Sequence, residues 1–181
     1  MRRRIFPVRV ISEAAVMVAL ATVLSYLKIF HMPQGGSVTA GSMVPLLWIS
    51  LRRGAKVGVI TCLIYGLIHF LLGPFAVDPV QVLLDYPLAF GALGLAGLFK
   101  RHPILGVAVG IGGRFIMHFL SGVIFFGIYA PPGIHPAVYS AIYNGGYLGG
   151  EFVISAILTY MMVKRGLITI YLEETGNSGR T

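Results

Sequence analysis

The sequence has 181 residues, of which 56% are hydrophobic and only 11% charged, and its mean hydropathy is +0.84. A soluble domain carries roughly 25% charged residues, so this composition excludes an ordinary soluble globule. The net charge of +8 does not indicate a nucleic-acid partner, because the basic residues lie in short clusters between apolar runs.

Six apolar segments predict an all-α integral membrane protein, a bundle of six transmembrane helices that form one domain over residues 1–181. A spanning helix needs about 20 mainly apolar residues. In chain order the candidates are 10–29, 38–51, 56–73, 79–99, 104–126 and 137–163. The second has only 14 residues and is the one that could be tilted or partly re-entrant. Continuously apolar runs favour helices over a barrel.

The N-terminus has the order of a signal peptide, with basic residues at 2–4 and Ala-Leu-Ala at 19–21. However, Glu13 lies early in the apolar run, and the run continues to Leu27. We therefore expect this segment to be retained as the first span. The polar residues 173–181 are expected to be disordered.

Basic residues predict the orientation of the bundle in the membrane. One side receives Arg2, Arg3, Arg4 and Arg9, then Arg52, Arg53 and Lys56, then Lys100 and Arg101, and finally Lys164 and Arg165. The opposite loops contain only Lys28. The positive-inside rule places the basic side, and with it both termini, in the cytoplasm. The three outer connections, 31–37, 73–79 and 130–136, are rich in Pro and Gly and either form a structured cap or mark helix breaks.

Four polar or aromatic residues share one depth in the predicted bundle. At 1.5 Å per residue, Tyr65, Asp85, His118 and Asn144 each lie about 9–12 Å below the outer ends of their helices. Ionisable groups inside a span are costly and often functional. A carboxylate, an imidazole, an amide and aromatic rings around one pocket would suit a small, flat, positively charged ligand. The alternative is that these groups only hydrogen-bond between helices.

Helical spacing adds further candidates. His118, Gly122 and Phe126 share one face of the fifth helix, and Asn144, Tyr147 and Glu151 share one face of the sixth. Arg114 and Glu151 lie about 15 and 18 Å above the inner ends of their helices, which predicts a buried ion pair below the pocket. Small residues four apart also recur, at Ala15/Ala19, Gly54/Gly58, Gly106/Gly110 and Gly145/Gly149, and allow helices to approach closely.

Several segments, in this order and spacing, resemble the thiamine-binding S-component of energy-coupling factor (ECF) vitamin transporters. The likeness covers nearly the whole chain. It lies in Glu13-Ala14-Ala15-Val16-Met17-Val18-Ala19, Met32-Pro33-Gln34-Gly35-Gly36-Ser37, Ser50-Leu51-Arg52-Arg53-Gly54, Leu83-Leu84-Asp85-Tyr86, His118-Phe119-Leu120-Ser121-Gly122 with Phe125-Phe126, and Val138-Tyr139-Ser140 leading to Tyr143-Asn144.

The resemblance implies a ligand site and a partner surface. The implied ligand contacts are Asp85, Tyr86, His118, Gly122, Tyr139 and Asn144, with Phe126 and Tyr65 where some relatives carry Trp. Ala15 and Ala19 would face the transmembrane coupling subunit, which works with two ATPase subunits. Some relatives carry Trp and Glu where this sequence has Gly36 and Ala40.

The leading hypothesis is therefore a high-affinity thiamine-binding subunit with no catalytic chemistry and no cofactor. The chain lacks a phosphate-cradling Gly-x-x-x-x-Gly-Lys-Ser/Thr motif, so the ATPase must be another chain. A single cysteine, Cys62, rules out an internal disulfide and gives no basis for a metal site. The alternatives are a thiamine precursor or another vitamin as ligand, an intramembrane hydrolase using Ser121 and His118, and a structural subunit without a ligand.

Overall fold

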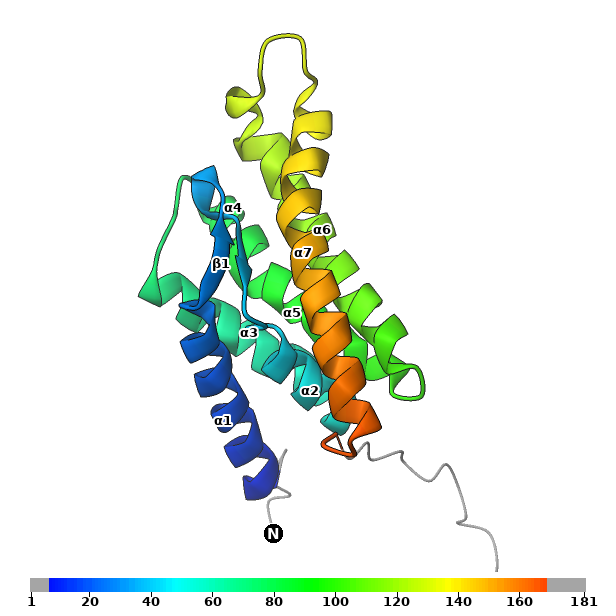
Figure 1. Cartoon of the computed structure of the whole chain (residues 1–181). Helices are drawn as coiled ribbons and strands as arrows, with labels where there is room; N and C mark the ends of the chain where they lie inside the picture. The colour runs from blue at the N-terminus through cyan, green and yellow to red at the C-terminus, as the bar shows by residue number, and fades with distance from the viewer. Residues whose placement is uncertain (1–6, 169–181) are drawn as a thin grey trace, which may run out of the picture.

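The computed structural model describes residues 7–168, which form a helical bundle with a small two-stranded sheet (Figure 1). Five segments are long and apolar enough to cross a membrane: Val8–Ser25 (α1), Ala55–Leu72 (α3), Pro79–Phe99, Pro103–Phe125 (α6) and Pro136–Lys164 (α7). Their ends agree with five of the predicted spans to within four residues, which confirms a helical membrane fold. The predictions for Arg2, Arg3, Arg4 and residues 173–181 lie outside the described residues.

The predicted second span is wrong as a spanning helix. Its helix, α2, covers only Val44–Arg53, and ten residues rise about 15 Å, half the thickness of the hydrocarbon layer. Eight of these ten residues are buried. The β-branched pair Val38-Thr39 lies in a strand instead, as such residues prefer. This part of the chain therefore returns across the bundle as a strand, a turn and a short, protein-covered helix.

An antiparallel hairpin that the sequence did not predict joins α1 to α2. Strand β1 (Lys28–His31) pairs with β2 (Ser37–Thr39), and Phe30 lies opposite Val38. A 3-10 turn, η1 (Pro33–Gly35), closes the hairpin. Gln34 and Gly35 both have positive φ, 60° and 96°, a conformation that Gly adopts without steric cost and Gln adopts rarely.

The fourth crossing consists of four short helical pieces. They are α4 (Pro79–Leu83), the π-helical turn η2 (Leu84–Leu88), α5 (Ala89–Leu93) and the 3-10 helix η3 (Gly94–Phe99). Pro87 has no backbone N–H and cannot continue an α-helical hydrogen-bond ladder, so the chain widens at this turn. Pieces of this kind occur often at functional sites, and Asp85 lies within η2.

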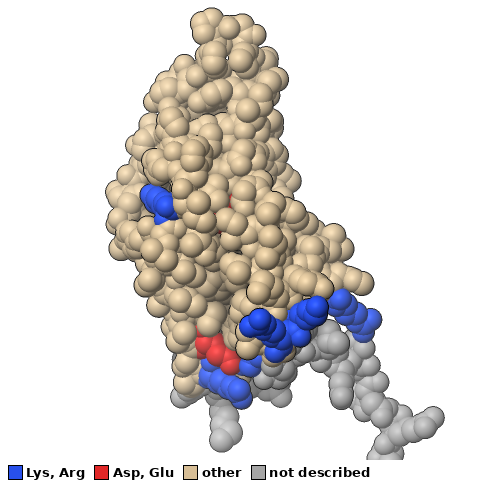
Figure 2. Space-filling model, in the orientation of Figure 1, with Lys and Arg blue, Asp and Glu red and all other residues tan. Residues whose placement is uncertain are grey.

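Charged residues gather at the end of the bundle where α1 begins and α7 ends (Figures 1 and 2). One carboxylate organises part of this end. Arg53 donates two short bonds to Glu13, Nε to Oε2 at 2.7 Å and Nη2 to Oε1 at 2.6 Å, and Arg52 Nε lies 3.4 Å from Oε2. Glu13 therefore ties the start of α1 to the end of α2.

The small-residue pairs have different surroundings. A Cβ added to Gly106 or Gly110 would lie 2.8 or 3.0 Å from a backbone oxygen of the fourth crossing, so this pair packs inside the bundle. A Cβ at Gly149 would meet nothing within 4 Å. Ala15 and Ala19 are exposed on α1, the span with the smallest buried share, 11%.

Candidate functional site

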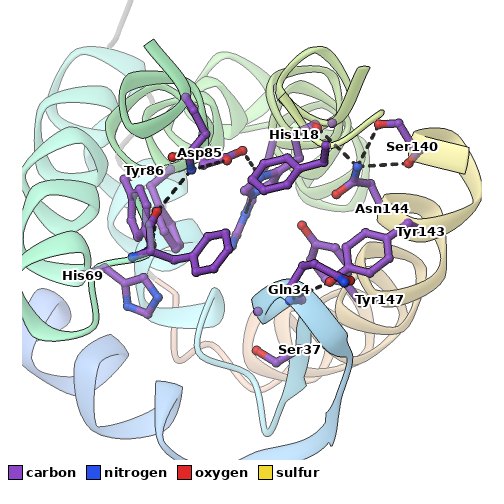
Figure 3. A pocket seen from close by; sticks show the side chains of 18 of the residues that line it. Gln34, Ser37, His69, Asp85, Tyr86, His118, Ser140, Tyr143, Asn144 and Tyr147 are labelled. Carbon is purple, nitrogen blue, oxygen red and sulfur yellow. Dashed lines mark hydrogen bonds and ion pairs between the residues drawn. The ribbon is translucent and has the colours of Figure 1, made fainter. Parts of the chain in front are cut away.

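A cavity lies between the fourth crossing, α6, α7 and the hairpin turn (Figure 3). Seven of the eight residues predicted to bind substrate line it: Asp85, Tyr86, His118, Gly122, Phe126, Tyr139 and Asn144. The eighth, Tyr65, lines an adjoining cavity and packs edge-on against Phe90, with the ring centroids 4.7 Å apart. The two cavities share Phe90 and His69 in their walls.

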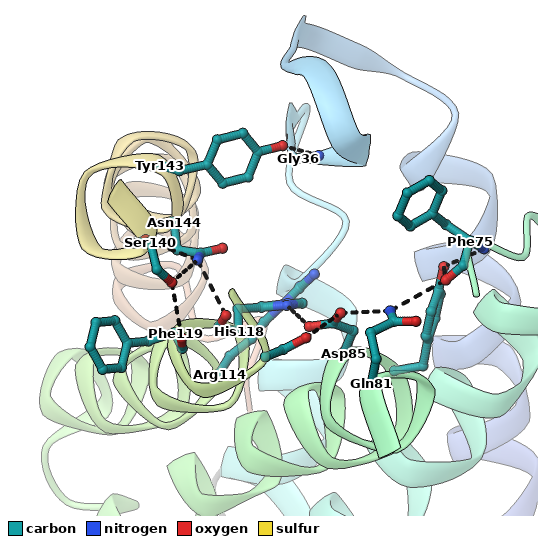
Figure 4. Close-up of polar contacts among 12 residues, drawn as sticks. Gly36, Phe75, Gln81, Asp85, Arg114, His118, Phe119, Ser140, Tyr143 and Asn144 are labelled. Carbon is teal, nitrogen blue, oxygen red and sulfur yellow. Dashed lines mark hydrogen bonds and ion pairs between the residues drawn. The ribbon is translucent and has the colours of Figure 1, made fainter. Parts of the chain in front are cut away.

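The Asp85 carboxylate is held by three side-chain contacts (Figure 4). Gln81 Nε2 and Ser121 Oγ each donate to Oδ2 at 2.7 Å, and His118 Nδ1 lies 2.8 Å from Oδ1. An ionised carboxylate only accepts hydrogen bonds, and this arrangement supplies donors to both of its oxygens. Asp85 is also 15% exposed, so the carboxylate remains accessible from the cavity.

Arg114 determines how His118 presents its ring. Arg114 Nε donates to His118 Nε2 at 3.2 Å, so Nε2 is an acceptor and carries no proton. The remaining ring proton lies on Nδ1 and is donated to Asp85. In this network His118 is a neutral imidazole, and the Asp85 charge is not cancelled by it. The Arg114 guanidinium itself lies over the Phe90 ring, 4.0 Å from the centroid.

Asn144 and Ser140 on α7 donate hydrogen bonds to backbone carbonyls of α6. Asn144 Nδ2 donates to the His118 carbonyl at 3.2 Å, and Ser140 Oγ donates to the Phe119 carbonyl at 2.9 Å. A Cβ at Gly122 would lie 2.2 Å from Ser140 Oγ. The two helices can approach this closely only because residue 122 has no side chain.

Aromatic side chains form the walls of the cavity. Phe75, in the connection between α3 and α4, stacks on Phe126, which directly follows α6, with a centroid distance of 5.9 Å. The Tyr86 hydroxyl accepts a hydrogen bond from the Phe75 N–H at 2.9 Å. The connection between α3 and α4 is thus fixed to η2, and the Phe75 ring lies in the cavity wall.

The hairpin turn covers the α7 side of the cavity. The Tyr143 hydroxyl accepts from the Gly36 N–H at 3.0 Å and donates to the Pro33 carbonyl. A Cβ at Gly36 would lie 2.8 Å from the Tyr143 hydroxyl, so the turn rests directly on the tyrosine. The absence of a side chain at Gly36 allows this close contact.

Twelve residues that line the cavity were not among those predicted to bind substrate: Gln34, Gly35, Gly36, Ser37, His69, Phe75, Gln81, Phe90, Arg114, Ser140, Tyr143 and Tyr147. One signal for Gln81 was available, because it precedes Asp85 by one helical turn and so shares its face. The turn residues had no such signal, since their position depends on a hairpin that the sequence did not predict.

The predicted ion pair between Arg114 and Glu151 is not formed. Glu151 Oε1 instead accepts from both the backbone N–H and the hydroxyl of Thr39, each at 2.7 Å. Both charged residues line the adjoining cavity, but Arg114 extends toward His118. Glu151 Oε2 is buried without a hydrogen-bond partner. Helical rise predicted similar heights, but the side chains point to different neighbours.

The sequence model of the family described as "Thiamine transporter protein" matches residues 11–170. The chain belongs to the thiamine transporter family. The resemblance to thiamine S-components of ECF transporters is thereby confirmed, and this is a family of transport proteins rather than enzymes.

Individual members of the thiamine transporter family show the same relationship. Thiamine transporter ThiT of Bacillus subtilis is 41% identical over 67% of this chain and 72% of the relative. ThiT of Lacticaseibacillus paracasei is 30% identical, covering 85% of this chain and 84% of the relative. The solved structure of ThiT from Listeria monocytogenes superposes with a TM-score of 0.80 at 26% identity, covering 88% of this chain and 95% of that one.

The hydrolase alternative does not fit a member of the thiamine transporter family. Ser121 and His118 do not hydrogen-bond to each other; each donates to Asp85 instead. Ser121 is fully buried, so its hydroxyl cannot reach a substrate in the cavity. Ser121 therefore supports the carboxylate rather than acting as a nucleophile.

Proposed function

We propose that the chain captures thiamine in this cavity, as the substrate-binding subunit of an ECF transporter. One observation carries the proposal: the Asp85 carboxylate reaches an aromatic-walled cavity, and the adjacent imidazole is neutral. Thiamine has two flat aromatic rings joined by a methylene group, and its thiazolium ring carries a permanent positive charge. A carboxylate attracts that charge, and aromatic faces stabilise a cation lying over them.

Phe75 and each of the eight residues predicted to bind the ligand have a role in this proposal. Asp85 pairs with the cationic ring, and Phe75 and Phe126 pack against the flat faces. His118 and Asn144 present polar edges that orient the pyrimidine. Tyr86 and Tyr139 complete the walls of the cavity, and Gly122, which has no side chain, leaves room for the ligand. Tyr65 acts from the adjoining cavity by supporting Phe90.

The orientation and partners also belong to the proposal. The basic end faces the cytoplasm, so the cavity opens toward the outside, where the vitamin is captured. The exposed face of α1 with Ala15 and Ala19 meets the transmembrane coupling subunit through close helix contact. Two separate ATPase subunits supply the energy for release to the inside.

Titration calorimetry on the purified full-length chain tests the proposal. Thiamine is expected to bind with submicromolar affinity, because capture from dilute solution requires it. A competition series with the separate pyrimidine and thiazole precursors and with unrelated vitamins identifies the ligand. Tighter binding of a precursor would reassign the ligand within the same fold, and no heat with any vitamin would favour a structural subunit.

A further inference from the structure

The fully buried Gln81 side chain links the ligand-facing carboxylate to the outer connection between α3 and α4. It is 1% exposed. Its Nε2 donates to Asp85 Oδ2 at 2.7 Å and to the Phe75 carbonyl at 3.3 Å, and its Oε1 accepts from the Val77 N–H at 3.1 Å. Both ends of the amide are thus engaged, and Figure 4 shows the continuous line of contacts.

Local sequence places Gln81 at this junction. Asp78 caps α4 by accepting from the Val80 N–H at 2.7 Å, and Pro79 follows at the first helical position. The cap fixes where the helix begins, so Gln81 lies one turn before Asp85 on the same face. From there its side chain reaches back to the backbone of residues 75 and 77.

Two donors meet at one oxygen of Asp85. Gln81 Nε2 and Ser121 Oγ both bond Oδ2, so this oxygen is turned toward the protein and the plane of the carboxylate is fixed. Hydrogen bonds to a charged acceptor are stronger than those between neutral groups. Removal of either donor therefore frees the carboxylate to rotate away from the geometry that faces the cavity.

We propose that Gln81 is a positioning residue for charge recognition, orienting Asp85 toward the cation and holding the Phe75 backbone against the site. The inference rests on the proposed function, because it assigns Gln81 to the recognition of the thiazolium charge. Gln81 acts through Asp85 and not by its own contact with the ligand. The Gln81 amide contacts both Asp85 and the backbone of residues 75 and 77. The position of the outer connection therefore depends on the orientation of the Asp85 carboxylate.

The matched variants are Gln81→Met, which keeps the length of the side chain and removes its hydrogen bonds, and Ser121→Ala, which removes only the second donor. Calorimetry compares thiamine with an analogue whose thiazolium is replaced by an uncharged thiophene. Both variants should weaken thiamine binding by about tenfold and the neutral analogue by less than about threefold. Equal loss for both ligands, or no loss, would overturn the assignment.

Hydrogen exchange on the ligand-free protein tests the second part of the proposal, that Gln81 holds the backbone of the outer connection. Gln81→Met should speed exchange in the 73–78 peptide, because the Val77 N–H loses its acceptor, whereas Ser121→Ala should leave that peptide unchanged. Equal protection in wild type and Gln81→Met would overturn the link to the outer connection. Wild-type protein that binds neither ligand would refute the thiamine proposal instead, and the exchange result would still be informative.

Discussion

His118 Nδ1 lies 2.8 Å from Asp85 Oδ1, across the contact between α6 and η2. The other ring nitrogen of His118 accepts from Arg114. An imidazole that accepts a hydrogen bond at one ring nitrogen and carries its proton on the other is neutral. His118 therefore leaves the charge of Asp85 in place, and among the described residues that line the main cavity Asp85 is the one anionic side chain and Arg114 the one cationic side chain.

Asp85→Asn should weaken thiamine binding by about tenfold or more, because the amide keeps the shape of the side chain and removes its charge. Calorimetry measures the loss. The uncharged thiophene analogue is the control, since its affinity should change by less than about threefold. Unchanged thiamine affinity would remove Asp85 from the site.

Gly122→Ala should lower stability by about 1–3 kcal/mol and weaken ligand binding, because its Cβ would lie 2.2 Å from Ser140 Oγ. Thermal unfolding in detergent measures the change. Gly112→Ala on the same helix is the matched control: nothing lies within 4 Å of its Cβ, so it should be neutral or slightly stabilising. Partial recovery is expected when Ser140→Gly is added to Gly122→Ala; similar losses at 112 and 122 would contradict the steric explanation.

Glu151→Leu should destabilise the protein by about 1–3 kcal/mol, because the buried Thr39 N–H would lose its acceptor. Glu151→Gln keeps an oxygen available to Thr39 and should cost clearly less. Thermal unfolding of the two variants separates these effects. A glutamine variant as unstable as the leucine variant would show that the charge, and not the tether to β2, matters.

Glu13→Gln should destabilise the basic end by about 1.5–3 kcal/mol, because two partly buried arginines share this carboxylate. Arg9→Ala is the contrasting change. The Arg9 side chain is 74% exposed, and its ion pair with Glu13 should contribute less than about 1 kcal/mol. Chemical or thermal unfolding compares the stabilities of the two variants. Equal losses would argue against a stabilising role for the contacts of Arg52 and Arg53 with Glu13.

Much of the fold was predictable because lipid imposes simple rules on composition. Long apolar runs and basic ends located five spans, and helix-breaking Pro79, Pro103 and Pro136 each begin a helical segment. The prediction of a second spanning helix failed because α2 is covered by protein, so the length of α2 is not set by the bilayer. A strand of three residues, β2, carries too little pattern to be recognised.

The site was predictable where depth alone decides contact. Asp85, His118 and Asn144 were placed at one level, and the structure brings them together. Depth does not say which way a side chain points, and for that reason the Arg114–Glu151 pair was predicted in error. Helical spacing placed Gln81 on the same face as Asp85, but its contact with Val77 depends on the path of residues 73–78, which periodicity does not describe.

The short helix α2 has a consequence for how the chain enters the membrane. Its ten residues end in Arg52-Arg53 and reach only halfway through the hydrocarbon, so α2 cannot partition into lipid as an independent hairpin partner. The extended residues before it need protein around their backbone polar groups. A stable place for α2 within the membrane therefore depends on the helices that follow it in the chain and pack around it, chiefly α3 and η3.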